Sequence, residues 1–278
     1  MIATKTSDAG NRIACTTATF GGLLPAKLQA MKDAGFVATE FWPRDLYEDP
    51  RGPDYSIGLL RDSGLSVCAY QAFRDYEGSP EPYKKHAYKI AEQMMDQMAW
   101  IGADLLILCT NMREDASGER SRIVDDLGEL AELGRSRNIR IAYEHVCWGR
   151  KTADYRDVWS IVKEVDHSHL GIMLDSLHIF CMDLPLDGID AIDPAKLFLV
   201  EVADIPKTNL PYMEVGRHYR LFPGEGVAPV NEFLRRVKGI GYEGLYSVEI
   251  MNARYLRDEP AFVAKHAAAT LREALASV

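Results

Sequence analysis

Short apolar runs alternate with segments of helical periodicity along almost the whole chain, and this alternation restricts the fold more than any other feature. Parallel strands joined by helices form α/β folds, and about eight such units in 278 residues match the size of a TIM barrel. The pattern predicts an α/β fold, a single (β/α)8 TIM barrel, as one domain over residues 1–278. The expected strands cover residues 12–17, 36–42, 65–71, 103–111, 140–149, 170–175, 196–201 and 245–249. The expected helices cover residues 24–35, 55–64, 82–102, 122–137, 154–165, part of 185–192, 229–240 and 259–276.

The charge of the chain disfavours two classes of partner. A formal net charge of -9 and a pI near 5.3 suit neither nucleic acid nor an anionic membrane, which both attract clustered Lys and Arg. The first six residues lack the features of a secretory signal, and no run of about 18 apolar residues occurs. We therefore expect a cytoplasmic protein that acts on a small molecule and binds neither nucleic acid nor membrane. The sequence leaves open whether it forms a homo-oligomer.

The cysteines indicate packing rather than chemistry. Their number is odd, they are dispersed, and no C-x-x-C pair occurs. We expect all of them to be reduced and most of them to pack in the core, with a nucleophilic cysteine as the minor alternative. They are Cys15, Cys68, Cys109, Cys147 and Cys181.

Four consecutive predicted strands end in an acid: Glu144, Asp175, Glu201 and Glu249. The carboxyl ends of the strands in such a barrel meet at the functional rim, so these side chains are expected to converge. Four converging carboxylates repel one another unless a cation binds them. Oxygen ligands suit Mg²⁺ or Mn²⁺, and also Co²⁺, better than Zn²⁺. The pattern predicts a divalent metal site, with Mg²⁺ or Mn²⁺ favoured.

Two further features are interpreted as ordinary structure. Glu40, near the end of the second strand, is expected to be a solvated strand-end acid. Met94, Met95, Met98 and Trp100 lie on or near the apolar face of the helix at 82–102, where core packing is favoured over a cofactor site.

The histidines divide by their position relative to the strands. His178 follows Asp175 by three residues, so it can lie over the barrel mouth as a general acid or base. His145 follows directly after a strand-end acid, and alternation along a strand turns it to the opposite face, in a packing or supporting role. His167 and His169 precede a strand and are expected to be solvated at the other end of the barrel.

A long segment after the seventh strand, residues 205–226, is expected to be a lid or binding loop. It contains Arg217, His218 and Arg220, and Arg74 lies just past the third strand. Arginines bind carboxylates through two parallel hydrogen bonds. These residues are therefore candidates for binding an anionic substrate.

These motifs resemble those of the xylose-isomerase-like TIM barrels, and more closely those of the bacterial 3-dehydroshikimate dehydratases of quinate and shikimate catabolism. The resemblance covers nearly the whole chain. The segments that carry it are Phe73-Arg-Asp-Tyr-Glu-Gly78, Tyr143-Glu144, Trp148-Gly-Arg150, Leu170-Gly-Ile-Met-Leu-Asp-Ser-Leu-His178, Ala203-Asp204, Arg217-His-Tyr-Arg-Leu-Phe-Pro-Gly224 and Val248-Glu249.

The resemblance implies a divalent metal held by the four strand-end acids, with His178, Arg74 and Arg220 near the substrate. The implied reaction converts 3-dehydroshikimate to protocatechuate and water through an enolate, a step of aromatic compound metabolism. Two positions depart from the dehydratase pattern: Glu201 stands where that pattern has glutamine, and Gly216 where it has serine.

Two other functions remain open. The same enolate could be reprotonated by a sugar or polyol isomerase or epimerase, with Glu144 or Glu249 and Glu201 as proton carriers. The chain could also be a metal-stabilised barrel or a sugar-binding module that catalyses nothing.

Overall fold

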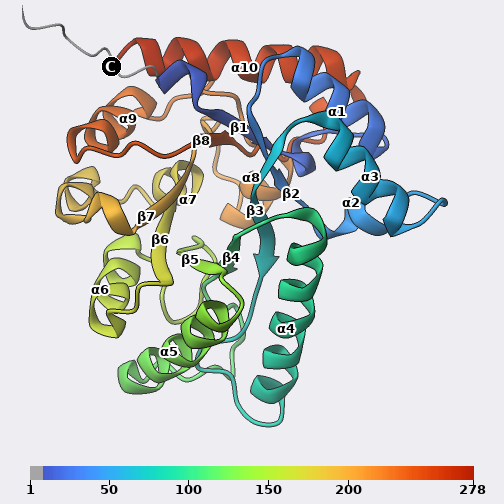
Figure 1. The fold of residues 1–278 in the computed structure, drawn as a ribbon. Coiled ribbons are helices and arrows are strands. Elements are labelled where there is room, and N and C mark those ends of the chain that lie inside the picture. Colours follow the sequence, from blue (N-terminus) through green and yellow to red (C-terminus); the bar gives the residue numbers. More distant parts are fainter. Residues whose placement is uncertain (1–8) are drawn as a thin grey trace, which may run out of the picture.

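Eight parallel strands close into a barrel in the order of the sequence (Figure 1). This arrangement is seen in a computed structural model, which describes residues 9–278. Each strand pairs with the next, and β8 pairs with β1 to complete the barrel, so the predicted fold is confirmed. The strands are β1 (Ile13–Thr16), β2 (Ala38–Phe41), β3 (Ser66–Phe73), β4 (Leu105–Cys109), β5 (Arg140–Glu144), β6 (Leu170–Asp175), β7 (Leu197–Glu201) and β8 (Tyr246–Val248).

Helices cover the outside of the barrel and lie close to the predicted ranges. They are α1 (Leu24–Asp33), α2 (Pro43–Tyr47), α3 (Pro53–Ser63), α4 (Tyr83–Ile101), α5 (Arg120–Ser136), α6 (Tyr155–Val165), α7 (Ser176–Cys181), α8 (Tyr212–His218), α9 (Val230–Gly239) and α10 (Pro260–Ala276). Within residues 9–278, none of these helices is both long enough and apolar enough to cross a membrane. The expectation drawn from the first six residues concerns a segment outside the described part of the chain.

Three short helices were not predicted, and two of them shape the barrel mouth. The helix expected within 185–192 is a 3-10 helix over Leu186–Ala191, whereas α7 begins directly after β6. The segment 205–226, expected to be a loop, contains α8. The third is α2, which follows β2. Helices of five to seven residues have too few turns to give a clear helical period in the sequence.

The interior of the barrel contains its own small apolar layer. Alternation along the strands turns every second side chain inward, where Leu105, Ile107, Ala142, Met173 and Leu199 pack with Ala69. The neighbouring residues on each strand face the helices and join the larger core between barrel and helices. The same alternation turns the strand-end acids of β5, β6 and β7 inward, above this apolar layer.

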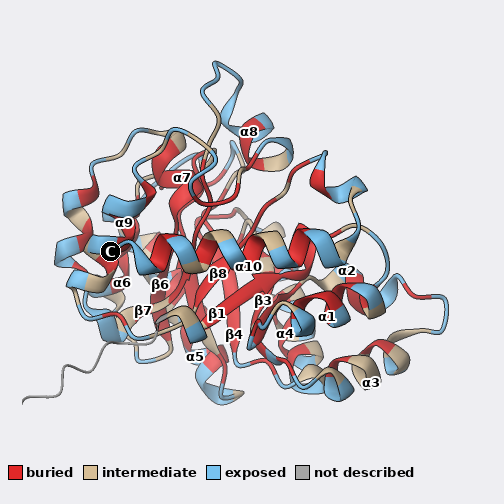
Figure 2. Cartoon of the chain, turned by 90° about the horizontal axis from the view of Figure 1, so that it is seen from above, coloured by how far each residue is buried: buried red, intermediate tan, exposed pale blue. Residues whose placement is uncertain are grey.

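The helices are amphipathic, with buried faces toward the barrel (Figure 2). Met94, Met95 and Met98 of α4 are buried in the core, which confirms their packing role. Trp100 was expected on or near the same face but is 50% exposed. It lies two residues after Met98, and a 3.6-residue helical period turns such a neighbour to the other side.

Candidate active site

The four predicted acids meet at the carboxyl end of the barrel, and all four are buried. Glu144, Asp175 and Glu201 are the last residues of β5, β6 and β7, and Glu249 directly follows β8. Carboxylate oxygens of Asp175, Glu201 and Glu249 lie within 4.8 Å of one another. Glu144 belongs to a second group, in which one oxygen of Glu144, one oxygen of Asp175 and a nitrogen of His178 also lie within 4.8 Å of one another. Asp175 therefore joins the two groups.

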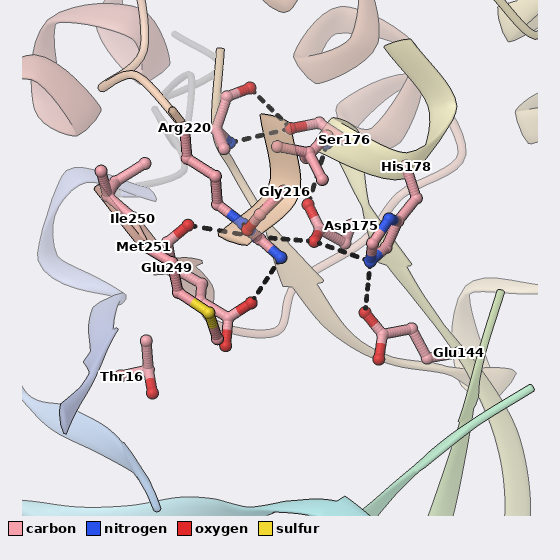
Figure 3. A network of polar contacts seen from close by, with 12 residues as sticks. Thr16, Glu144, Asp175, Ser176, His178, Gly216, Arg220, Glu249, Ile250 and Met251 are labelled. Atoms are coloured by element: carbon pink, nitrogen blue, oxygen red, sulfur yellow. Dashed lines mark hydrogen bonds and ion pairs between the residues drawn. The ribbon is translucent and has the colours of Figure 1, made fainter. Parts of the chain in front are cut away.

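Arg220 provides a buried positive charge within this cluster (Figure 3). Its Nη1 donates to Asp175 Oδ2 at 2.8 Å, and its Nη2 lies 2.8 Å from Glu249 Oε2. The guanidinium is held further by the backbone carbonyl oxygens of Gly216 and Glu249, at 2.9 and 3.1 Å. Burial opposes its charge, but Asp175 and Glu249 raise the pKa of Arg220 above its ordinary value. Arg220, predicted to bind substrate, thus pairs with two of the predicted metal ligands.

Asp175 also determines where His178 lies. Its Oδ1 accepts a hydrogen bond from the Leu177 backbone at 2.9 Å and so caps α7, which begins at the next residue. The first turn of α7 carries His178 back over the strand end, where its Nε2 lies 3.5 Å from Asp175 Oδ2 and 3.6 Å from Glu144 Oε1. His178 is buried rather than loosely placed over the mouth.

The other ring nitrogen of His178 has a donor beside it. The backbone N–H of Cys147 donates to Nδ1 at 3.4 Å, and the Cys147 sulfur lies 3.3 Å from the same atom. Burial, followed by the charge of Arg220, holds the pKa of His178 well below its ordinary value. The lowered pKa favours the neutral ring, and its Nε2 faces the two acids.

Glu144 is in an environment that favours its protonated form. Burial, followed by the charges of Asp175 and Glu249, raises the pKa of Glu144 to about 8. Its Oε2 accepts a hydrogen bond from the Cys109 thiol at 3.0 Å, a contact that the sequence did not predict. Burial also raises the pKa of Asp175. In the absence of a cation, part of this cluster retains protons near neutral pH.

The expectation that Glu40 is solvated is wrong. Its side chain points into the barrel and is completely buried, with Oε2 accepting from Gln71 Nε2 at 3.1 Å. Its pKa rises to about 7, mainly because it is buried. Burial also raises the pKa of Glu201 well above its ordinary value. Glu40 is the next-to-last residue of β2, so its place near a strand end was visible in the sequence.

A narrow cavity opens beside the acid cluster. It measures about 20 Å³, room for about one water-sized particle, and its walls include Glu144, His178, Arg220 and Glu249. Arg74 and Arg217 line it as well. A wider hollow of about 650 Å³ adjoins it, shares Arg217 as a wall, and is lined by His218. The structure thus places His218 beside the entrance, away from the acids.

Arg74 and Arg217 face the cavity without forming an ion pair to a carboxylate of the described residues. Neither forms an ion pair within residues 9–278, and both are half-buried. Burial, followed by the charge of Arg74, lowers the pKa of Arg217 below its ordinary value. Two cations that face one cavity repel each other, and an anion between them removes that repulsion. This side of the cavity therefore suits a carboxylate.

His145 and the cysteines take the places predicted for them, whereas His167 and His169, expected to be solvated, are partly buried. His145 is buried between the rings of Tyr155 and His178, and burial lowers its pKa to about 3. His167 and His169 are half-buried at the amino end of β6. All five cysteines are free, and Cys15, Cys109 and Cys147 are buried.

The residues of the cluster fit a divalent cation. The donors are carboxylate oxygens with one imidazole nearby, a set that divalent cations accept. Glu201 Oε2 and Glu249 Oε1 are buried without a hydrogen-bond partner. Such buried acceptors are costly unless a ligand or a proton satisfies them.

Comparisons with known proteins agree with this fold. The family model described as xylose isomerase-like TIM barrel matches residues 28–274. A protein of Pseudomonas aeruginosa named 3-dehydroshikimate dehydratase is 36% identical over 236 residues, which are 85% of this chain and 37% of that protein. The chain thus spans well under half the length of this relative.

Two solved structures have the same fold. One is a fusion of a xylose isomerase-like TIM barrel with a 4-hydroxyphenylpyruvate dioxygenase, with a TM-score of 0.90 and 33% identity, covering 94% of this chain and 42% of that one. The other, the IOLI protein with a binding zinc atom, has a TM-score of 0.84 and 20% identity, covering 95% of this chain and 98% of that one. At that identity the second likeness shows the fold alone.

Proposed function

The chain belongs to the xylose isomerase-like TIM barrel family, and from this premise we propose that it is a divalent-metal-dependent lyase. Its substrate is 3-dehydroshikimate, which it converts to protocatechuate and water. A related cyclic hydroxy-ketone that bears a carboxylate is the alternative substrate. The observation that carries the proposal is that the acid cluster and His178 share one cavity with Arg74 and Arg217. Neither arginine forms an ion pair within residues 9–278. The likeness to the Pseudomonas aeruginosa dehydratase supports the substrate.

Glu144, Asp175, Glu201 and Glu249 would hold the cation, with Mg²⁺ or Mn²⁺ favoured by the oxygen donors. A cation bound there supplies Lewis-acid polarisation of the substrate ketone, which acidifies the adjacent carbon. The zinc atom of the IOLI structure supports a divalent metal in this fold, without deciding which one binds here.

His178 would transfer the proton at Nε2. Its neutral ring is oriented by the Cys147 backbone, and its Nε2 faces Glu144 and Asp175. Dehydration needs removal of a proton next to the ketone and delivery of a proton to the departing β-hydroxyl. Glu144 Oε1, 3.6 Å from Nε2, would help to orient the ring.

Arg74 and Arg217 would bind the substrate carboxylate, because both face the cavity without a carboxylate partner. Arg220 has a different task in this arrangement, since its charge is already balanced by Asp175 and Glu249. It orients these two acids.

The test is to incubate the purified protein with 3-dehydroshikimate and Mg²⁺ or Mn²⁺ and to follow the absorbance of the aromatic product. We expect turnover that EDTA abolishes and added metal restores. The variant His178→Gln should lose activity by a factor of about 10² to 10⁴, the usual contribution of a proton-transfer residue. His167→Gln, far from the acids, is the matched control and should keep full activity. No aromatic product at any metal concentration would refute the dehydratase.

One observation favours a second function. Glu201, which stands where the dehydratase pattern has glutamine, supplies a further carboxyl group in the cluster. An isomerase or epimerase uses such a second acid to return the proton to the enolate. Incubation with cyclic polyol ketones and ketoses in D₂O separates the two functions. Deuterium incorporation with epimerised or isomerised product, and without loss of water, would favour the second.

A further inference from the structure

The indole of Trp148 touches two functional groups of the site at once. Its ring meets the ring of His178 edge to face, with centroids 4.8 Å apart and planes at 87°. The guanidinium carbon of Arg217 lies over the same indole, 5.4 Å from its centroid. Trp148 is half-buried and lines the cavity beside both partners. A single side chain thus contacts the group that would transfer the proton and a group that would bind the substrate.

Gly216 provides the space that this indole occupies. A Cβ atom at position 216 would lie 2.6 Å from Cζ3 and 2.9 Å from Cη2 of Trp148. Real side chains do not approach so closely, so any larger residue at 216 has to displace the ring. Gly216 lies within α8 and is not among the residues of positive φ. Its backbone would therefore accept alanine, and the indole is the closest obstacle, with Leu177 Cδ2 next at 3.3 Å.

Gly216 also connects the indole to the acid cluster. Its carbonyl oxygen accepts a hydrogen bond from Arg220 Nε at 2.9 Å, and Arg217 is the next residue in the chain (Figure 3). Displacement of α8 from the indole would therefore move both arginines. Edge-to-face ring contacts and cation–π contacts each contribute enough to favour one orientation of their partners.

We propose that Trp148 is a positioning residue that holds His178 and Arg217 in their working orientation, and that Gly216 is the position that makes this packing possible. The part of this inference that concerns turnover rests on the proposed dehydratase function. The part that concerns packing does not.

The packing is tested by a double-mutant cycle on thermal stability. Gly216→Ala should lower the melting temperature by several degrees, because its methyl group collides with the indole. Trp148→Phe should offset this loss in the double variant, because the smaller ring leaves room for the methyl group. Gly58→Ala in α3 is the matched control, since no atom lies within 4 Å of its added Cβ, and it should not lower stability. Additive effects of Gly216→Ala and Trp148→Phe would overturn the packing.

The positioning role is tested on the same variants by steady-state kinetics. Trp148→Ala should lower kcat through His178 and raise KM through Arg217, each by about tenfold, the order of loss expected from misplaced groups. Gly216→Ala should show both effects, and the double variant with Trp148→Phe should recover most of the activity. Trp100→Phe, at an exposed tryptophan, should change neither constant. Unchanged kcat and KM in folded Trp148→Ala would overturn the role.

These outcomes separate the two proposals. If the protein converts no 3-dehydroshikimate, the stability cycle still measures the coupling between Trp148 and Gly216. If turnover is normal but the cycle is additive, the dehydratase stands and the packing of Trp148 against Gly216 falls.

Discussion

Arg220 and Asp175, 45 residues apart in the sequence, form a 2.8 Å ion pair between two side chains that are almost completely buried. The same guanidinium reaches Glu249 at 2.8 Å, so one cation links the ends of β6 and β8. The ion pair holds two predicted metal ligands close together before any metal binds. Its removal should therefore affect stability and metal binding together.

Arg220→Met should lower the free energy of unfolding by about 3–5 kcal/mol, the usual cost of leaving a buried charge without its partner. Urea denaturation of the metal-free protein measures this loss. Arg236→Met provides the control, because Arg236 pairs with Asp190 on the surface, where such pairs contribute about 1 kcal/mol or less. Equal losses in the two variants would show that Arg220 is not a buried charge partner.

Metal binding should release protons and weaken as the pH falls. The pKa of Glu144 is raised to about 8, mainly because it is buried, while a metal ligand has to be deprotonated. Calorimetric titration with Mn²⁺ at pH 7, in two buffers of different ionisation enthalpy, counts the released protons. Identical heats in both buffers would contradict the raised pKa of Glu144.

The metal-free protein should become less stable as the pH rises. A carboxyl group whose pKa is raised on folding, as that of Glu144 is from 4.5 to about 8, binds more protons in the folded state. Its contribution to stability is complete below pH 4.5 and is lost as the pH rises through about 8. Melting temperatures recorded with EDTA should fall over this window and change less with saturating Mn²⁺. A rise over the same window in EDTA would reverse the expected sign.

Glu201→Gln should keep dehydratase activity within about tenfold. Glutamine is the residue of the dehydratase pattern at this position, has the same shape, and keeps one side-chain oxygen that can bind the cation. Rates with 3-dehydroshikimate and rates of deuterium exchange on a polyol ketone should both be measured. Loss of exchange with intact turnover would mark Glu201 as the proton carrier of a second activity.

Arg217→Met and Arg74→Met should each raise KM for 3-dehydroshikimate more than they lower kcat. Both residues face the cavity without a carboxylate partner, so each would contribute mainly to binding the substrate carboxylate. Initial rates over a range of substrate concentrations give both constants. Arg113→Met, at an arginine paired with Asp115, is the control and should leave both constants unchanged. An unchanged KM in both cavity variants would place the carboxylate elsewhere.

The barrel and its acid cluster could be predicted because they follow from local pattern. Strand alternation and the position of each acid at a strand end are visible in the sequence, and parallel pairing then brings these ends together. The same rule applied to Glu40, but a single strand-end acid has no feature that distinguishes a buried side chain from a solvated one. Its burial depends on Gln71 and Glu201, which lie on other strands.

The remaining features of the site depend on contacts that the sequence does not encode locally. Helix α7 is too short to show a helical period, and its place is fixed by the cap that Asp175 provides. The pairing of Arg220 with Asp175 arises from how the segment after β7 folds back over the barrel. The Trp148 contact likewise depends on the approach of α8.

Anomalous diffraction from crystals grown with Mn²⁺ tests the convergence of the four acids most directly. We expect one manganese peak within bonding distance of carboxylate oxygens from Glu144, Asp175, Glu201 and Glu249. A peak bound elsewhere, or no peak in a protein whose melting temperature is unchanged by EDTA, would contradict a shared metal site and the chemistry proposed for it.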